Sequence, residues 1–358
     1  MAFKDLYQLE TSPAWEVPQE FQTCFNWEFA PERSRLLNLY ERGKTMQWNA
    51  TERIDWSQEL DSENPQQLPE SALPIASTPV YQRMSAAEKA NVRRHHQAYQ
   101  TSQFLHGEQG AMICAAKTVQ QVPDLDSKLY AATQVVDEAR HVEAYKKLLE
   151  KFGMAYPMTP PLQQLLDQVL RDTRWDMTYL GMQVVIEGLA LAAFARLRDE
   201  AQNPLAASVN AYVMEDEARH VAFGRLSLRD YYPQLTQAER NAREEFLVEA
   251  CFHMRDRFNA MEVWRNLDLP IEECIEHLQT SGAMAKFRQR LFTRIVPCVK
   301  DIGLWGETVR RGFERLGVLE YANVDLEQMA ASDEQKAADF DARRAHVESV
   351  ISAANELA

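Results

Sequence analysis

A short string of acidic, basic and imidazole side chains occurs twice in this sequence. The residues Asp-Glu-Ala-Arg-His stand at positions 137–141 and again at 216–220. On a helix, residues i and i+3 lie on one face, so each string can present a carboxylate and an imidazole to a common point. Each string is therefore a candidate for half of a metal site. The four residues concerned are Glu138, His141, Glu217 and His220.

Each string is preceded by a further glutamate at the same distance. Glu108 lies 30 residues before Glu138, and Glu187 lies 30 residues before Glu217. The two halves are offset by 79 positions throughout (187 − 108, 217 − 138). Residues this far apart in an antiparallel helix pair with a short loop lie at similar heights. We therefore expect four glutamates and two histidines to meet at one level.

Carboxylates and imidazoles without thiolates suit iron or manganese. One glutamate from each of two helices, with Glu-x-x-His from each of two others, is the ligand set of dinuclear carboxylate bundles. A single Glu-x-x-His pair is common on the solvent-exposed face of a helix and is weak evidence for a metal site. Two copies with matched upstream glutamates favour a dinuclear metal site over a solvated face.

The spacing of prolines and apolar residues predicts an all-α protein. Proline-free windows carry apolar residues at intervals of three and four, and no window alternates as a strand does. Residues 1–84, rich in proline and tryptophan, should form an irregular arm with one helix near 32–47. The aromatic side chains of this arm are expected to pack it on the bundle. We divide the chain into this arm, a bundle at 85–231, and further helices at 232–358. The four bundle helices are expected at 85–121, 124–152, 161–202 and 205–231, and three or more further helices are expected to fill 237–267, 271–317 and 332–357.

Composition narrows the function classes. The chain has 358 residues, 46% of them hydrophobic, and a net charge of −14, which argues against nucleic-acid and anionic-membrane partners. No apolar run appears long enough to span a membrane, and no signal peptide is recognisable. The lack of a spanning run and of a signal peptide predicts a cytoplasmic protein. The five cysteines form no C-x-x-C pair, so they predict reduced thiols.

On these motifs, residues 85–231 resemble the ferritin-like di-iron oxygenase and oxidase superfamily. The doubled pattern is most similar to p-aminobenzoate N-oxygenases and bacterial multicomponent monooxygenase hydroxylases. The resemblance implies a ferritin-like four-helix bundle core with additional N- and C-terminal helices. It also implies that four glutamates are catalytic, with Glu138 and Glu217 bridging the metals. The four are Glu108, Glu138, Glu187 and Glu217. An additional histidine of the N-oxygenases is replaced here by Val213. The implied metal ligands are Glu108, Glu138, His141, Glu187, Glu217 and His220.

The implied activity is that of a dioxygen-activating, non-haem di-iron monooxygenase or N-oxygenase acting on a small organic substrate. Two iron ions are expected, with a mixed manganese-iron pair left open, as is the choice among N-oxygenation, hydroxylation and desaturation. Electrons must come from a ferredoxin or reductase, because the chain has no dinucleotide fingerprint. A homodimer is the family expectation. The alternative is a radical or metal-holding subunit like the ribonucleotide reductase small subunit, in which Tyr145, one turn after His141, would carry the radical.

Neighbouring residues predict a supporting shell. Asp137 and Asp216 can each turn toward the histidine of the opposite helix, since a ligating histidine usually donates its other N–H to a carboxylate. Arg140 and Arg219 can pair with these aspartates. Glycines within the helices indicate either tight packing or room beside the metals, each at a cost of about 1 kcal/mol. The glycines are Gly107, Gly110, Gly181, Gly188 and Gly224, and the residues expected in core or pocket are Met112, Cys114, Leu191 and Phe194.

Overall fold

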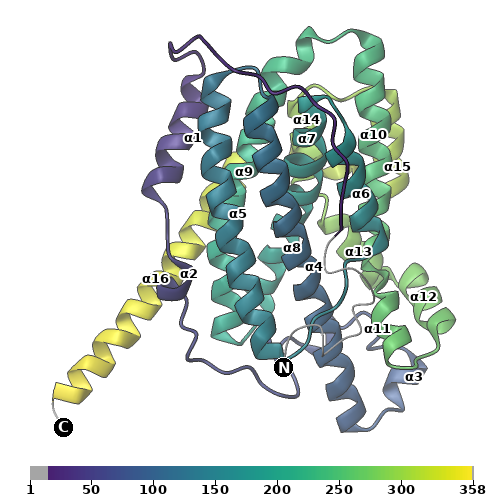
Figure 1. Cartoon of the computed structure of the whole chain (residues 1–358). Coiled ribbons are helices and arrows are strands. Elements are labelled where there is room, and N and C mark those ends of the chain that lie inside the picture. Colours follow the sequence, from purple (N-terminus) through teal and green to yellow (C-terminus); the bar gives the residue numbers. More distant parts are fainter. Residues whose placement is uncertain (1–14, 357–358) are drawn as a thin grey trace.

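The computed structural model describes residues 15–356, and within that range the chain forms helices and connecting segments without a strand (Figure 1). The prediction of an all-helical fold is confirmed. The helices nearest the centre are α4 (Ala86–Gln121), α5 (Leu125–Phe152), α8 (Glu187–Glu200) and α9 (Pro204–Tyr231). The other elements are α1 (Ser34–Thr45), α2 (Ala50–Arg53), η2 (Glu70–Ala72), α3 (Pro79–Gln82), α6 (Pro160–Arg171), α7 (Trp175–Tyr179), η3 (Leu180–Ile186), η4 (Tyr232–Gln234), α10 (Gln237–Asp256), η5 (Arg257–Asn259), α11 (Met261–Asn266), α12 (Ile271–Thr280), α13 (Gly282–Arg290), α14 (Ile295–Asp301), α15 (Glu307–Leu316), η6 (Leu319–Asn323) and α16 (Leu326–Glu356).

Side-chain caps fix the ends of the long helices. A capping box between Ser85 and Glu88 begins α4, and the Asp124 carboxylate accepts a backbone N–H at the start of α5. Gly153 ends α5 in the left-handed conformation at φ +67°. Asn203 caps α9 in the same way as Asp124 caps α5. These boundaries lie within a residue of those predicted for three of the four bundle helices.

The prediction of one continuous helix over 161–202 is wrong. The chain leaves the helix after α6 and re-enters it at α7. Lys117 of α4 donates its Nζ to the carbonyl oxygens of Leu170 and Asp172, at 2.9 and 2.7 Å, and so satisfies the end of α6. The Asp172 carboxylate accepts the backbone N–H of Arg174 at 2.9 Å, which fixes the turn. The break between α6 and α7 depends on this tertiary contact with Lys117, and no proline or glycine at the break predicts it from the sequence.

The helix re-entered at α7 widens into π-helical η3 immediately before Glu187. Two other predicted helical spans also differ from the structure, one by an interruption and the other by its starting residue. The span 237–267 is interrupted at η5 and at Ala260, whose φ is +50°, and the last helix begins at Leu326 rather than near 332. The expectation of three or more helices after the bundle is confirmed.

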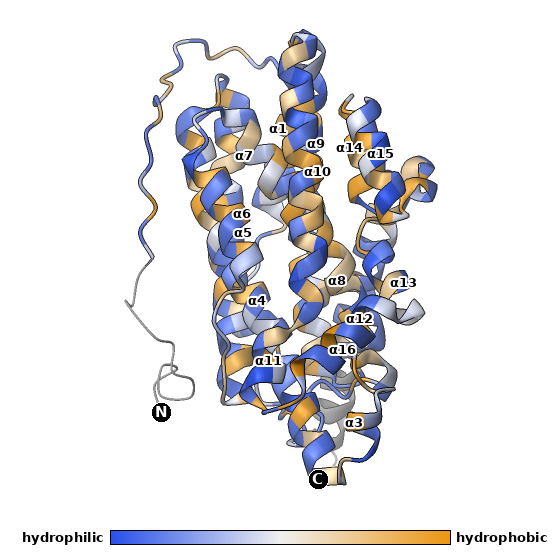
Figure 2. Ribbon diagram, turned by 90° about the vertical axis from the view of Figure 1, so that its right-hand side faces the viewer, coloured by the Kyte–Doolittle hydropathy of each residue, from blue (hydrophilic) through white to orange (hydrophobic). Residues whose placement is uncertain are grey.

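Packing places the bundle at the centre of the molecule. Helix α4 lies along α5, and α8 lies along α9, while α1 and α16 flank α9 on one side and α10 and α15 lie on the other (Figure 1). Apolar and polar residues are interspersed along the helices in Figure 2, and the buried apolar side chains of many helices together form the core. One stretch, Trp175–Glu200, is long and apolar enough to span a membrane, contrary to the sequence-based expectation, but 78% of its apolar window is buried in the fold.

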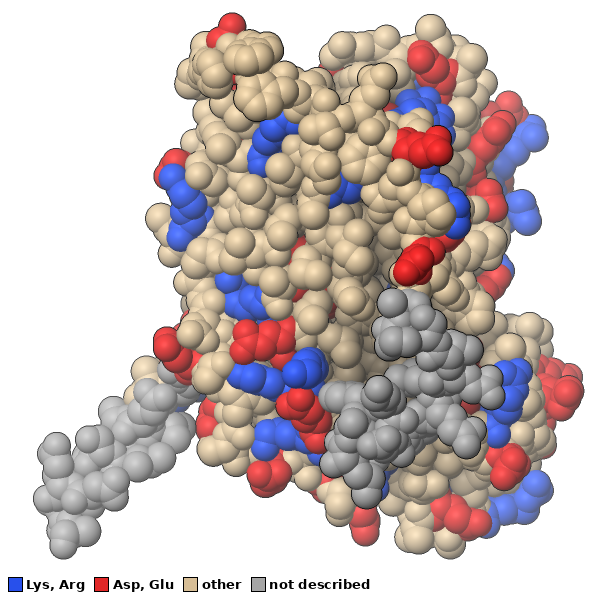
Figure 3. Space-filling model, viewed as in Figure 1, with Lys and Arg blue, Asp and Glu red and all other residues tan. Residues whose placement is uncertain are grey.

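The surface shows mixed charge. On the face drawn in Figure 3, acidic and basic side chains are interspersed among uncharged ones, without an extended basic patch in the part of the chain described.

Two glycines give a paired test of packing. A Cβ on Gly181 would lie 2.2 Å from Cγ2 of Val169, whereas a Cβ on Gly107 would meet nothing within 4 Å. We expect Gly181→Ala to lower the free energy of unfolding by about 1–3 kcal/mol through overpacking. Gly107→Ala should raise it by about 1 kcal/mol through helix propensity. Urea denaturation measures both, and equal effects of the two substitutions would contradict this account.

The buried imidazole of His96 makes stability depend on pH. His96 stacks on Trp264, with 5.8 Å between ring centroids, and burial followed by the charge of Arg196 lowers the pKa of His96 to about 3. In the unfolded chain its pKa is about 6.5. Between these values the unfolded state binds the extra proton, so stability falls as pH drops below 6.5, by about 1.4 kcal/mol per unit.

His96→Phe should remove this share of the pH dependence. Metal-free wild type and variant are compared by denaturant unfolding at pH 5 and pH 7, so that the other titrating groups are common to both. The wild type should lose more stability on acidification than the variant, and equal losses would show that His96 is protonated in the folded state.

Candidate metal centre

The structure brings the six predicted ligands together in the middle of the bundle. Glu108 comes from α4, Glu187 is the first residue of α8, and each Glu-x-x-His pair lies on α5 or α9. All six side chains are buried, with at most 4% of the residue exposed. Their donor atoms form two groups, each with all atoms within 4.8 Å of one another. The groups are Glu108, Glu138, His141 and Glu217, and Glu138, Glu187, Glu217 and His220.

The two groups share Glu138 and Glu217, the residues expected to bridge. Nδ1 of His141 lies 3.3 Å from Oε2 of Glu138 and 3.0 Å from Oε1 of Glu217. Nδ1 of His220 lies 3.0 Å from Oε1 of Glu138 and 3.5 Å from Oε1 of Glu217. The same ring nitrogen of each histidine therefore faces the shared carboxylates, which is the arrangement of two cation positions side by side.

The carboxylates strongly perturb one another. Burial, followed by the charge of Glu217, raises the pKa of Glu108 well above its ordinary value, and burial with Glu217 and Glu138 does the same for Glu187. Burial also opposes ionisation of Glu138, but His220 and His141 outweigh it and hold the pKa of Glu138 below its usual range. Four acids with only two imidazoles leave a buried excess of negative charge when ionised, which cations would neutralise.

Several of the oxygen and nitrogen atoms that could coordinate a metal have no hydrogen-bond partner among the described residues. They are Oε2 of Glu138, Oε2 of Glu187, both carboxylate oxygens of Glu217, and Nδ1 of His220. Buried polar atoms are normally paired, so a cluster of orphans at one point needs an explanation. Two metal ions coordinated by oxygen and nitrogen would supply the missing partners, and the residues present fit that group.

The second ring nitrogen of each histidine faces an aspartate of the opposite helix. Nε2 of His141 lies 3.1 Å from Oδ2 of Asp216, and Nε2 of His220 lies 3.3 Å from Oδ2 of Asp137. The structure thus has the crossed pairing expected from sequence. A proton held on Nε2 leaves Nδ1 free to coordinate.

Arginines join the two aspartates. Nη2 of Arg140 donates to Oδ1 of Asp137 at 2.5 Å and to Oδ2 of Asp216 at 2.8 Å, and Arg219 pairs with Asp216. Burial acts to raise the pKa of Asp216, but His141 and the two guanidinium groups hold it below its usual range. Asp216 therefore remains an acceptor at neutral pH.

The N-terminal arm adds two contacts that the sequence analysis did not predict. Gln47 donates to Oδ1 of Asp137 at 2.7 Å, and the Trp48 indole donates to Oδ2 of Asp216 at 2.8 Å. The tryptophan content indicated that the arm docks on the bundle. Nothing in the spacing indicated which tryptophan reaches the aspartates.

Gln134 is a further polar residue that the sequence analysis missed. Its Nε2 donates to Oε1 of Glu138 at 3.0 Å and to Oε1 of Glu187 at 2.9 Å, and so joins one ligand from each helix pair. Gln183 of η3 contacts Oε1 of Gln134 at 3.4 Å. The available signal was position, because Gln134 lies one helical turn before Glu138 on the same face.

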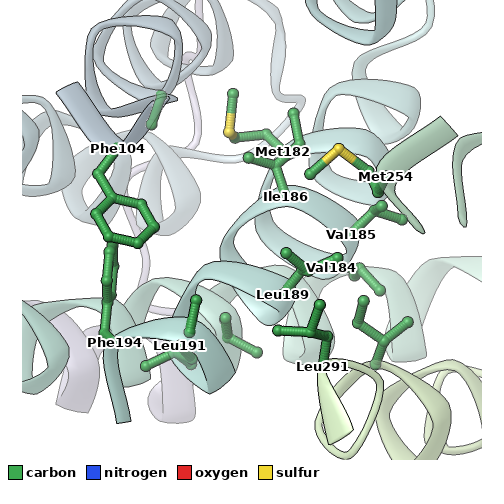
Figure 4. Packing of buried hydrophobic residues seen from close by; sticks show 14 of the residues in the cluster. Phe104, Met182, Val184, Val185, Ile186, Leu189, Leu191, Phe194, Met254 and Leu291 are labelled. Carbon is green, nitrogen blue, oxygen red and sulfur yellow. The ribbon is translucent and has the colours of Figure 1, made fainter. Parts of the chain in front are cut away.

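An apolar wall adjoins the site. Tyr145 packs against Phe104 and Phe194, with ring centroids 5.6 and 5.7 Å away, and its hydroxyl donates to Oδ1 of Asn210 at 3.2 Å. Figure 4 shows the Phe104 and Phe194 rings meeting between their helices. Cys114, Leu191 and Phe194 are buried, while Met112 is partly exposed.

The chain is similar to one known protein family and to several solved structures. The family model described as P-aminobenzoate N-oxygenase AurF matches residues 31–303. A mutant R2-like ligand-binding oxidase with an anaerobically reconstituted Mn/Fe cofactor is 15% identical, with a TM-score of 0.50 over 75% of this chain and 94% of that chain. A Synechococcus protein with aldehyde deformylating oxidase activity is 16% identical, with a TM-score of 0.46 over 63% of this chain and 97% of that chain. No curated protein sequence matches the chain.

Proposed function

The chain belongs to the p-aminobenzoate N-oxygenase family, and we propose that it uses dioxygen to oxidise the nitrogen of a small aromatic amine. Family membership identifies it as a non-haem di-iron oxygenase or oxidase. The observation that carries the proposal is the pair of buried donor groups sharing two glutamates. The choice of nitrogen as the oxidised atom rests on the family match.

In this proposal the six residues divide between two metal ions. Glu108 and His141 would hold one ion, Glu187 and His220 the other, and the glutamates common to both groups would reach both ions. Val213, buried on α9, stands where N-oxygenases carry an additional histidine, so we propose six protein ligands. Bound iron would supply the binding and reduction of dioxygen.

Other residues of the protein orient the ligand side chains, and burial keeps bulk water away from them. Asp137 and Asp216 hold a proton on Nε2 of each histidine, which keeps Nδ1 facing the carboxylates. Gln134 fixes the rotamers of two glutamates through its paired hydrogen bonds. The burial of all six ligands excludes bulk water from the reacting atoms.

The reaction requires an external reductant. Conversion of an aromatic amine to the hydroxylamine forms one N–O bond, takes one oxygen atom from dioxygen, and reduces the other to water with two electrons and two protons from outside. We propose that a ferredoxin or flavin reductase supplies the electrons, since the sequence contains no dinucleotide fingerprint of its own.

Labelled dioxygen tests the proposal. Full-length protein is loaded anaerobically with ferrous ion, given p-aminobenzoate and a chemical reductant, and exposed to ¹⁸O-labelled dioxygen. We expect about two irons per chain and a hydroxylamine carrying one labelled oxygen, detected by mass spectrometry. Ring hydroxylation would retain the oxygenase but refute N-oxygenation, and a product without label would refute both.

The same sample addresses the radical alternative. A persistent tyrosyl signal in electron paramagnetic resonance that disappears in Tyr145→Phe, with no oxidised amine, would favour a radical-holding subunit. The observed hydrogen bond from Tyr145 to Asn210 is what a packed, protonated phenol requires.

A further inference from the structure

The C-terminal helix α16 covers a cavity on the outer side of the bundle. Helix α16 lies along α9 (Figure 1), and the cavity is enclosed between α16 and the seam where α8 meets α9. Its volume is about 250 Å³, well above the roughly 10–15 Å³ that a single water molecule requires. Each of the three helices contributes apolar side chains to its lining, among them Leu191 on α8, Val221 on α9 and Ala330 on α16.

The floor of this cavity spans the level of the metal centre. Leu191 lies one turn after Glu187 on α8, and Val221 lies one turn after Glu217 on α9. Helices α8 and α9 run antiparallel, because only residues 201–203 connect them. One turn further along each helix therefore leads in opposite directions from the ligands. Leu191 and Val221 lie on either side of the ligand level, and Ala218, which directly follows Glu217, lines the cavity between them.

Leu191 and Val221 form the barrier between the cavity and the ligands. Residues four apart share a helix face, so each of the two adjoins the glutamate one turn before it. Leu191 is 1% exposed and Val221 is 7% exposed. A small apolar molecule can cross a layer of aliphatic side chains when they fluctuate, whereas an ion would have to lose its hydration shell. The barrier therefore favours uncharged, apolar molecules.

Ion pairs hold α16 over the cavity. Each arginine that lines the cavity contacts an acidic residue of α16, and two of these acids also line the cavity. The charges around it are thus matched within the protein, which again suits an uncharged molecule rather than an ion. The pairs are Arg42 with Glu334 at 2.5 Å, Arg225 with Glu327 at 3.7 Å, and Arg294 with Asp333 at 2.5 Å.

We propose that dioxygen reaches the metal centre through this cavity, with α16 as its roof and Leu191 and Val221 as its inner barrier. The proposal rests on the proposed function in taking dioxygen as the reactant, and on the cavity for the route. Dioxygen is small and uncharged, so it enters an apolar path without the desolvation cost that an ion would incur. Leu191 and Val221 thus control access to the metal ligands without coordinating a metal themselves.

Xenon tests the route without turnover, because apolar cavities bind this gas. Crystals of metal-loaded, full-length protein under xenon pressure should contain a xenon atom between Leu191, Val221 and Ala330. Ala330→Phe fills the cavity from α16, so it should abolish xenon binding. It should also slow the reaction of ferrous-loaded protein with dioxygen about tenfold in stopped-flow measurements, which corresponds to a barrier higher by about 1.4 kcal/mol. Ala338→Phe is the matched control, because Ala338 is exposed on the same helix and is not among the residues lining the cavity. This control should bind xenon and react with dioxygen as the wild type does.

Leu191→Ala makes the opposite change, because it thins the inner barrier. It should speed the reaction with dioxygen by about the same factor, while iron content and melting temperature show whether each variant folds and holds its metals. Absence of xenon from the wild-type cavity would overturn the proposal. An unchanged dioxygen rate in folded Ala330→Phe would place the route elsewhere. If Ala330→Phe does not fold, an unchanged or slower rate in Leu191→Ala has the same meaning. Absence of amine oxidation alongside the expected xenon and dioxygen results would refute only the proposed function.

Discussion

Replacing Glu138 by alanine is expected to reduce bound iron from about two ions per chain to fewer than one. Glu138 belongs to both donor groups and lies between the two histidines, at 3.3 Å from Nδ1 of His141 and 3.0 Å from Nδ1 of His220. Removing it takes one ligand from each position at once and leaves both imidazoles with less compensating charge. Metal content after gel filtration measures the loss, and reaction with dioxygen should disappear with it.

Glu143→Ala is the matched control, because Glu143 lies on the same helix but on its outer side. Its side chain is 46% exposed and pairs with Lys147 at 2.9 Å, a contact worth at most about 1 kcal/mol. This variant should retain two irons and wild-type helicity in circular dichroism. Tight binding of two irons by Glu138→Ala would contradict the assignment of a shared carboxylate.

The sequence predicts the ligand set because helical periodicity alone determines which residues share a face and a height. Two glutamates 30 residues upstream of two identical strings suffice to bring six side chains to one level when the helices are antiparallel. The crossed pairing of Asp137 with His220 follows from the same geometry. These residues lie on α4, α5, α8 and α9, where spacing in sequence becomes spacing in space, although π-helical η3 ends directly before Glu187.

Contacts made by irregular segments were not predictable in this way. Gln47 and Trp48 reach the aspartates from a connection whose path depends on packing rather than on backbone periodicity. The break after α6 likewise depends on Lys117, more than fifty residues away in the sequence.

The Asp216→Asn variant should show the second large effect, a loss of both stability and metal affinity. Asp216 accepts hydrogen bonds from Trp48, Arg140, Arg219 and His141 while itself 0% exposed. An asparagine has one acceptor oxygen and would turn an N–H₂ group toward other donors. Buried guanidinium charge would lose its partner, which costs about 3–5 kcal/mol. Loss of the histidine's acceptor should weaken metal binding about ten- to a hundredfold.

Asp230→Asn on the same helix separates this effect from a general loss of negative charge. The Asp230 side chain is 60% exposed and pairs with Arg33 at 2.9 Å, so its neutralisation should change the free energy of unfolding by no more than about 1 kcal/mol. Urea denaturation of the metal-free proteins gives the stability difference, and chelator competition gives the affinity. Equal behaviour of the two variants in both measurements would mean that Asp216 neither stabilises the buried arginines nor orients His141. A stability loss with unchanged metal affinity would limit its role to the arginines. The Asp216 carboxylate accepts hydrogen bonds from the arm, α5 and α9. Because the same carboxylate docks the N-terminal arm and fixes the His141 imidazole at the metal centre, we expect stability and metal affinity to fall together.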